Sequence, residues 1–195
     1  MTSRAGKPIV IAEYDPAWAE RFGAERDAIV AACGDALVAV EHVGSTSVPG
    51  LAAKPIIDIM PGLRSLDDAP PLIAPLATLG YEYAPEAELP SEVDGGMPER
   101  RYFRKDVDGV RAFHMHMVEV GSEFWERHLL FRDYLRVHPD AALAYADLKR
   151  RLAAAYNETM LADGVNAYVG YTDLKTEFIT ATEEKARVWR QATSG

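Results

Sequence analysis

The segment from residue 36 to residue 60 constrains the fold of this chain more than any other. It consists of two largely apolar runs, residues 36–43 and 54–60, separated by Gly44-Ser45-Thr46-Ser47 and a short connector. This pattern predicts two strands joined by a small-residue turn that exposes backbone N–H groups and hydroxyls. Asp58 is the only acid of the second run, and burying an unpaired carboxylate among isoleucine and methionine side chains costs free energy. We therefore expect Asp58 to belong to a functional site.

The elements predicted around this segment are of two kinds. Before residue 121 we expect a strand at 9–13, helices at 17–33 and 67–79, a short strand at 81–84, and a hairpin of strands 100–107 and 110–120 around Asp108-Gly109. After residue 121 we expect three helices, at 124–137, 141–161 and 172–192. This order favours an α+β fold with a mixed or antiparallel sheet and flanking helices. We expect one domain, residues 1–195, with the sheet in about 1–121 and a helical portion in about 122–195.

Composition excludes some classes of function. The 195 residues carry a net charge of -9 at pH 7, so no overall positive field gathers nucleic acid. Any phosphate-bearing partner must be held by a local cluster of basic residues. The single cysteine, Cys33, cannot form an intramolecular disulfide and fits a reducing compartment. No apolar run is long enough to span a membrane, so we expect a cytoplasmic protein with no membrane partner.

Gly44-Ser45 and Asp58 together indicate phosphate chemistry. A glycine-serine turn after a strand offers N–H and hydroxyl groups to a phosphate. An acid on the neighbouring strand can hold a divalent metal ion that bridges phosphate oxygens. The alternative is a plain turn beside a structural acid that is paired within the fold. The turn lacks the Gly-x-Ser-x-Gly spacing of a nucleophile elbow, so we do not expect Ser45 to act as a nucleophile.

The stretch from His42 to Ile59 resembles the signature of the GrpB family, also called UPF0157, an uncharacterised family that is also found fused to dephospho-CoA kinase. Residues 11–18, 113–116 and 171–179 are similar to further landmarks of the family. The family is grouped with the DNA polymerase β-like nucleotidyltransferase superfamily, so the resemblance implies a nucleotidyltransferase-like fold. In that superfamily a Gly-Ser turn precedes a strand with two acids one residue apart. Asp58 matches the first acid, but Met60 stands in the place of the second, and one carboxylate does not fix two metal ions.

His114 and His116 are candidates to complete a metal site with Asp58. Alternate residues of a strand face the same side, so both imidazoles lie on one face of the predicted strand 110–120. Two histidines and a carboxylate can make an open three-ligand site, which suits Zn²⁺, Mn²⁺ or Fe²⁺ better than Mg²⁺. The expected cofactor is a divalent ion: Mg²⁺, Mn²⁺ or Zn²⁺. The alternative is a pair of histidines that are hydrogen-bonded in a polar cleft.

Basic and aromatic residues outside this segment are candidates to bind a nucleotide. Arg101 and Arg104 can each bind phosphate bidentately, but they have opposite parity on the predicted strand 100–107, so at most one faces a given side. Tyr171 and Lys175 are four residues apart and share one side of a helix or its entry. The superfamily resemblance implies that the helical portion closes the nucleotide cleft, where Tyr171 would stack on a base and Lys175 would reach a phosphate. The alternative is ordinary packing and surface charge.

Functions of different classes follow from these features. The first is a metal-assisted nucleotidyl or phosphoryl transferase, or a protein that binds a nucleotide or another phosphorylated small molecule. In it Ser45 and Asp58 are the catalytic residues, and Gly44, Ser45 and Thr46 bind the nucleotide together with the basic and aromatic residues named above. Asp58, His114 and His116 hold the ion. The second is a non-catalytic folding or partner-binding module with a vestigial site, which Met60 favours. A third is hydrolysis at a metal centre of two histidines and one aspartate.

Overall fold

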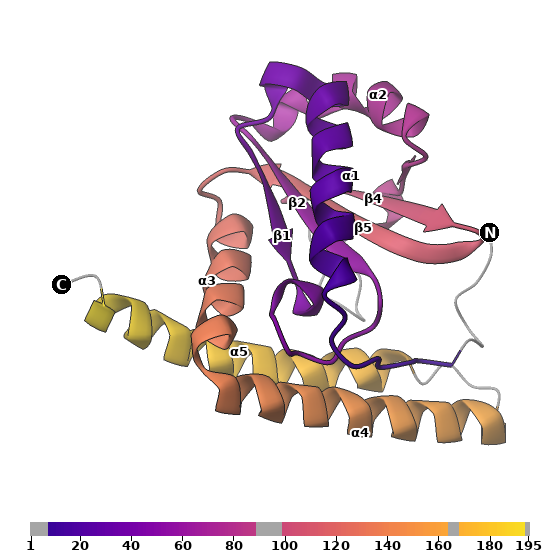
Figure 1. The fold of residues 1–195 in the computed structure, drawn as a ribbon, viewed down its shortest axis with the longest axis vertical. Coiled ribbons are helices and arrows are strands. Elements are labelled where there is room, and N and C mark those ends of the chain that lie inside the picture. Colours follow the sequence, from indigo (N-terminus) through magenta and orange to yellow (C-terminus); the bar gives the residue numbers. More distant parts are fainter. Residues whose placement is uncertain (1–7, 89–98, 164–167, 194–195) are drawn as a thin grey trace.

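The computed structural model describes residues 8–88, 99–163 and 168–193. They form an α+β fold around one mixed five-stranded sheet (Figure 1). The strands are β1 (Ala39–Val43), β2 (Ile57–Leu63), β3 (Glu82–Tyr83), β4 (Arg100–Val107) and β5 (Val110–Glu119), in the spatial order β1-β2-β5-β4-β3. β2 and β5 are parallel, and all other neighbours in the sheet are antiparallel. The fold class expected from the sequence is confirmed.

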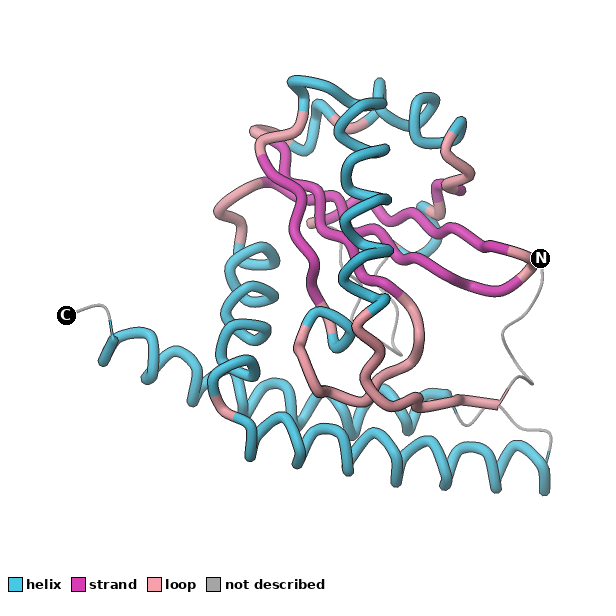
Figure 2. The backbone as a smooth tube through the Cα atoms, viewed as in Figure 1, coloured by secondary structure: helices cyan, strands magenta, loops and turns pink. Residues whose placement is uncertain are grey.

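Helices cover the sheet from two sides. α1 (Ala17–Cys33) and α2 (Ile73–Thr78) pack on one face, and α3 (Glu123–Val137) packs against part of the other. α4 (Pro139–Asp163) and α5 (Tyr168–Thr193) run side by side as a long pair, next to the turn that connects β1 and β2 (Figure 2). None of the described helices is both long and apolar enough to cross a membrane.

Residue alternation along β2 and β5 gives the sheet an apolar face and a polar face. Ile57 and Ile59 of β2 are buried in the main core under α1 and α2, together with the apolar residues of β5 that share their face. The intervening residues, among them Asp58 and His114, point to the other face. Because the side chains of a strand alternate with a period of two, one register places both the core and the candidate site.

One predicted element forms as expected, and two others are shorter or interrupted. The hairpin of β4 and β5 forms as predicted, because Asp108 and Gly109 adopt positive φ angles of 52° and 73°, as a type I′ turn requires. The predicted strand at 9–13 is reduced to a single bridge between Ala12 and Ala53. The predicted helix at 67–79 is interrupted by 3₁₀ turns before α2 begins, because the prolines in this segment have no N–H group to donate.

The connector after the Gly44–Ser47 turn joins the sheet to the helical layer. Val48 and Leu51 are buried in a cluster with Leu130 of α3, Tyr145 of α4 and Ala186 of α5. This apolar contact holds the connector against three helices at once. The end of β1 and the start of β2 therefore lie where the sheet meets the helical layer, and the candidate site lies there too.

Candidate functional site

The parallel register of β2 and β5 brings the predicted metal ligands together. Asp58 and His114 are paired residues of adjacent strands, and His116 follows two residues later on the same face. His114 Nδ1 lies 3.2 Å from Asp58 Oδ1, and His116 Nε2 lies 3.9 Å from the same oxygen. One potential ligand atom of each residue lies within 4.8 Å of the other two. These three side chains form a cluster with the donor set of a metal site.

Gly44 brings the backbone of the turn against the Asp58 carboxylate. Its φ angle is 69°, in the region that favours glycine. A Cβ atom at this position would clash with Oδ2 and Cγ of Asp58, so this close approach requires glycine. The turn that is predicted to bind phosphate therefore directly borders the cluster of Asp58, His114 and His116.

The three hydroxyls of the turn have different surroundings. Thr46 is buried, and its Oγ1 lies 3.0 Å from His42 Nε2 and donates to a backbone oxygen at 3.3 Å. Ser47 Oγ donates to the Gly44 backbone oxygen at 2.6 Å. Ser45 is partly exposed, and its hydroxyl has no side-chain hydrogen bond to any residue in the described part of the chain. Ser45 thus remains the candidate to meet a phosphate, whereas the Thr46 hydroxyl is used inside the fold.

Two arginines of α3 hold the turn from the helical side. Arg136 donates to the Ser47 backbone oxygen from Nε and Nη2, at 3.1 and 2.9 Å. Arg132 donates to the His42 backbone oxygen at 3.1 Å and pairs with Glu41 at 2.6 Å. Hydrogen bonds from a charged donor are stronger than those between neutral groups. The position of the turn therefore depends on α3 as well as on the sheet.

The carboxyl of Asp58 is ionised in this environment. Burial by itself would raise its pKa, but the neighbouring His114 and His116 outweigh that effect and hold the pKa far below its ordinary range. Burial lowers the pKa of His116 to about 4, although Asp58 acts in the opposite direction. Burial also lowers the pKa of His128 to about 4. At pH 7 an anionic Asp58 carboxylate therefore stands beside the neutral imidazole of His116, and these are the protonation states in which a carboxylate and an imidazole bind metal ions.

Two lysines of the helical layer lie within electrostatic reach of Asp58. Lys149 of α4 is 3% exposed, donates to the Ala52 backbone oxygen at 2.5 Å and lies 4.5 Å from the centre of the Tyr145 ring. Burial and the charge of Lys175 lower the pKa of Lys149 to about 7. Burial lowers the pKa of Lys175 of α5 as well, while the charge of Asp58 raises it. Two amino groups thus lie near a single carboxylate.

The remaining predicted nucleotide-binding residues are placed differently. Arg104 and Arg101 of β4 are ion-paired with glutamates, with closest distances of 2.6 and 3.5 Å. Tyr171 falls within α5, but its side chain lies outside the described residues. The structure thus places Lys175 within electrostatic reach of Asp58 and pairs Arg101 and Arg104 with glutamates instead.

Sequence reasoning alone does not find three residues that surround the cluster. Arg100 Nη1 lies 2.6 Å from His116 Nδ1, and the ring centre of His128 lies 6.3 Å from that of His116. Lys149 has a recognisable signal, because it lies in a buried stripe of α4 at positions 145, 149, 153 and 156, where a lysine is unusual. Arg100 and His128 have no comparable signal, since their approach to His116 depends on how β4 and α3 pack in three dimensions.

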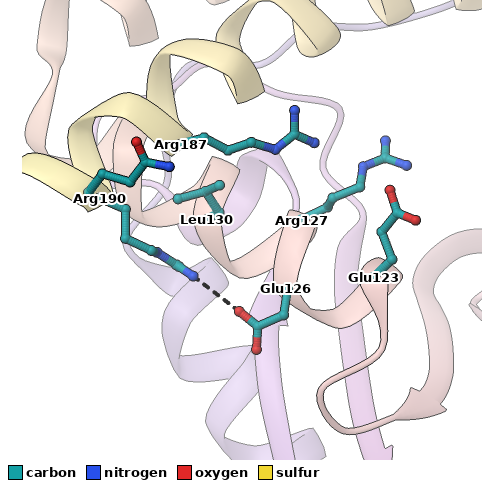
Figure 3. A pocket seen from close by; sticks show the side chains of 7 residues that line it. Glu123, Glu126, Arg127, Leu130, Arg187 and Arg190 are labelled. Carbon is teal, nitrogen blue, oxygen red and sulfur yellow. Dashed lines mark hydrogen bonds and ion pairs between the residues drawn. The ribbon is translucent and has the colours of Figure 1, made fainter. Parts of the chain in front are cut away.

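A surface hollow of about 470 Å³ lies between α3 and α5, and the candidate metal ligands do not line it (Figure 3). Charged residues from both helices line it, with Glu126 and Arg127 contributed by α3 and with Arg187 and Arg190 contributed by α5. Arg190 Nη1 lies 3.1 Å from Glu126 Oε2, an ion pair that links the two helices (Figure 3).

Comparisons with known proteins match nearly the whole chain to one protein family. A family model described as GrpB protein matches residues 8–185. The UPF0157 protein YqkA of Bacillus subtilis (strain 168) is 38% identical over 185 residues, which are 95% of this chain and 49% of that protein. A dephospho-CoA kinase of Mycolicibacterium paratuberculosis is 28% identical over 206 residues, covering 97% of this chain and 48% of that protein. The chain thus spans about half the length of these curated relatives.

A solved structure has the same fold. The crystal structure of conserved protein GrpB from Enterococcus faecalis matches with a TM-score of 0.75 and 35% sequence identity. The match covers 92% of this chain and 99% of that one.

Proposed function

The chain belongs to the GrpB family, and we propose that it binds a divalent metal ion at Asp58, His114 and His116 and, beside that ion, a nucleotide or another phosphorylated small molecule. One observation carries this proposal: a carboxylate oxygen and two imidazole nitrogens converge within 4.8 Å of one another on the polar face of the sheet. The Gly44 turn lies against the same carboxylate, so that the ion and a phosphate would share one location.

The donor set favours Zn²⁺ or Mn²⁺ as the ion. Imidazole suits Zn²⁺, whereas Mg²⁺ prefers oxygen ligands in near-octahedral geometry. Three protein ligands also leave a coordination position open, as in catalytic rather than structural zinc sites. The depressed pKa of Asp58 keeps its carboxylate available for an ion at neutral pH.

The charges around Asp58 support an anionic ligand. With a divalent ion bound, the Asp58 carboxylate would be the single negative charge facing the ion and the amino groups of Lys149 and Lys175. An excess of positive charge in a partly buried site favours an anion such as phosphate. The partly exposed Ser45 hydroxyl and the N–H groups of the turn would contact the phosphate oxygens.

Nucleotidyl or phosphoryl transfer is the reaction that we propose for this arrangement, in keeping with the resemblance of the sequence to the nucleotidyltransferase superfamily. A bound ion would polarise a phosphate oxygen. Asp58 would hold and orient that phosphate through the ion, Ser45 would orient it directly, and Lys175 would neutralise its charge. We propose one ion rather than two, because Met60 is fully buried in an apolar cluster with Phe124 and Trp125 and offers no second carboxylate.

A non-catalytic partner-binding module is the second candidate function. The buried Met60 favours it, since the second acid that two-metal transfer needs is absent from β2. A dephospho-CoA kinase of about twice the length contains a region similar to nearly the whole of this chain. In this alternative the cluster would be a remnant, and neither metal ions nor nucleotides would stabilise the fold.

Thermal unfolding with Zn²⁺, Mn²⁺ or Mg²⁺, each with and without ATP as the probe, separates the two candidates. We expect Zn²⁺ or Mn²⁺ to raise Tm and ATP to raise it further only when the ion is present. A ligand at a hundred times its Kd adds about 2.7 kcal/mol, roughly 5–10 °C for a chain of this size.

Two matched variants each remove one carboxylate. Asp58→Asn removes it from the cluster, and the control Asp67→Asn removes it from an exposed position. Asp58→Asn should lose the metal-dependent shift while its own Tm stays within a few degrees of wild type, and Asp67→Asn should keep the shift. Equal shifts in both variants would contradict the proposed site. The absence of any shift in the wild-type protein would favour the partner-binding module.

A further inference from the structure

Arg100 is a buried cation that is held against His116 from several sides. Its side chain belongs to β4, and the residue is 9% exposed. Nη1 lies 2.6 Å from His116 Nδ1, and Nη2 donates to the Ala87 backbone oxygen at 3.2 Å. The guanidinium carbon lies 4.8 Å from the centre of the Tyr102 ring. These contacts leave Arg100 in a defined position beside the imidazole.

The chemistry of the guanidinium determines which nitrogen of His116 carries the proton. Arginine has only hydrogen-bond donors and stays protonated in proteins. At 2.6 Å the Nδ1 atom of His116 must therefore accept a hydrogen bond from Arg100 and cannot carry a proton itself. A neutral imidazole keeps one ring proton, so that proton lies on Nε2. The doubly protonated imidazolium is excluded for the same reason.

The Nε2–H group is directed at the candidate metal site. Nε2 lies 3.9 Å from Asp58 Oδ1, which is longer than a hydrogen bond. We propose that Arg100 fixes His116 as the Nε2–H tautomer, which narrows the three-residue ligand set proposed above: His116 donates a hydrogen bond to an oxyanion of the bound ligand, and only Asp58 and His114 are protein ligands of the ion. The tautomer stands on geometry alone, and the roles toward the ion and the oxyanion rest on the function proposed above.

The two histidines of the cluster differ in their partners. A histidine that ligates a metal ion usually donates its other ring N–H to a carboxylate or a carbonyl oxygen. The Nδ1 atom of His116 instead faces a donor, the Arg100 guanidinium. If Nε2 bound the ion, the ring proton would move to Nδ1, and that N–H would point at the N–H of Arg100. His114 Nδ1 faces the Asp58 carboxylate, which is an acceptor, so an ion can take the place of a proton between them. Arg100 is thus a positioning residue that acts through His116.

The tautomer is measured directly in the wild-type protein without any metal ion. Long-range ¹H–¹⁵N correlation spectra of histidine-labelled protein at pH 7 report which ring nitrogen carries the proton, and the His116→Phe variant assigns the signal. We expect protonated Nε2 and unprotonated Nδ1 at His116. A protonated Nδ1, alone or together with Nε2, overturns the proposal.

Calorimetric titrations with Zn²⁺ alone and with Zn²⁺ plus inorganic pyrophosphate test the two roles. We expect His114→Phe to weaken Zn²⁺ binding at least about tenfold, and His116→Phe to leave it within about threefold while weakening pyrophosphate binding about tenfold. Arg100→Met frees Nδ1 and should tighten Zn²⁺ binding by about tenfold. Arg111→Met removes the same charge from a residue paired with Asp106 and should not.

The outcomes separate this proposal from the function on which it rests. Equal losses of Zn²⁺ affinity in His114→Phe and His116→Phe would make His116 a ligand and overturn the assigned role. Equal effects of Arg100→Met and Arg111→Met would assign the change to net charge and overturn the role of Arg100. Failure of the wild-type protein to bind Zn²⁺ would refute the proposed metal site, and the spectra of the metal-free protein would still decide the tautomer.

Discussion

Replacing Gly44 with alanine tests whether the turn and the Asp58 carboxylate form a single site. The residue has a φ angle of 69° and a ψ angle of -173°, a backbone conformation that is essentially restricted to glycine and that costs another residue about 1–3 kcal/mol. The added Cβ would also clash with Oδ2 and Cγ of Asp58, which adds about 1–3 kcal/mol if it behaves as ordinary overpacking. We therefore expect the free energy of unfolding to fall by about 2–6 kcal/mol.

Gly50 provides a matched control in the same connector. Its φ angle is 78°, and a Cβ placed there would meet no atom within 4 Å. Gly50→Ala should therefore lower the free energy of unfolding by only the backbone contribution of about 1–2 kcal/mol. The difference between the two variants measures the contact between the turn and Asp58.

Urea unfolding and calorimetric titration with Zn²⁺ are the two assays for this pair. Because Gly44→Ala displaces the carboxylate or the turn, we expect it to weaken Zn²⁺ binding at least about tenfold, whereas Gly50→Ala should bind as the wild-type protein does. If both variants lose the same stability and both retain wild-type affinity for Zn²⁺, the close approach of Gly44 to Asp58 has no role in the site.

Three further predictions concern the surroundings of the site. The pKa of Lys149 is lowered to about 7 in the folded state, so the unfolded chain binds more protons between pH 7 and pH 10, and wild-type stability should rise over that range. Lys149→Met should lack this rise and be more stable than wild type at pH 7. If the free energy of unfolding, measured with urea, depends on pH in the same way for both proteins, this prediction is wrong. Arg136→Ala removes both hydrogen bonds to the Ser47 backbone oxygen, which should lower stability by about 1.5–3 kcal/mol and speed hydrogen exchange at residues 44–48, and unchanged exchange there would refute the role of α3 in holding the turn. Gly62→Ala would place a Cβ against the Trp125 ring and should lower stability by about 1–3 kcal/mol with altered tryptophan fluorescence; wild-type stability would show that α3 adjusts freely.

The parts of this structure that local rules control were predictable from the sequence. Alternation along a strand placed His114 and His116 on one face, and Asp108-Gly109 identified the hairpin between β4 and β5. The prediction of strand, turn and strand around Asp58 is also confirmed. These features depend on residues that are near one another in the chain, where the period of side chains and the chemistry of turns decide the outcome.

The parts that depend on distant contacts were not predictable in the same way. The parallel pairing of β2 with β5 sets Asp58 beside His114, although 55 residues lie between them in the sequence. The partners of Arg101 and Arg104 are glutamates on other segments, and no pattern within β4 indicates them. No sequence pattern indicates the donation from Arg100 to His116, because it follows from packing that composition and periodicity do not encode.

Anomalous diffraction from crystals grown with Zn²⁺ shows most directly whether Asp58 and its neighbouring histidines form a metal site. The account predicts a zinc peak between β2 and β5, about 2.0–2.2 Å from a carboxylate oxygen of Asp58 and from a ring nitrogen of His114. A peak that lies on other side chains, while Asp58 and His114 remain in contact with each other as they are here, would contradict it.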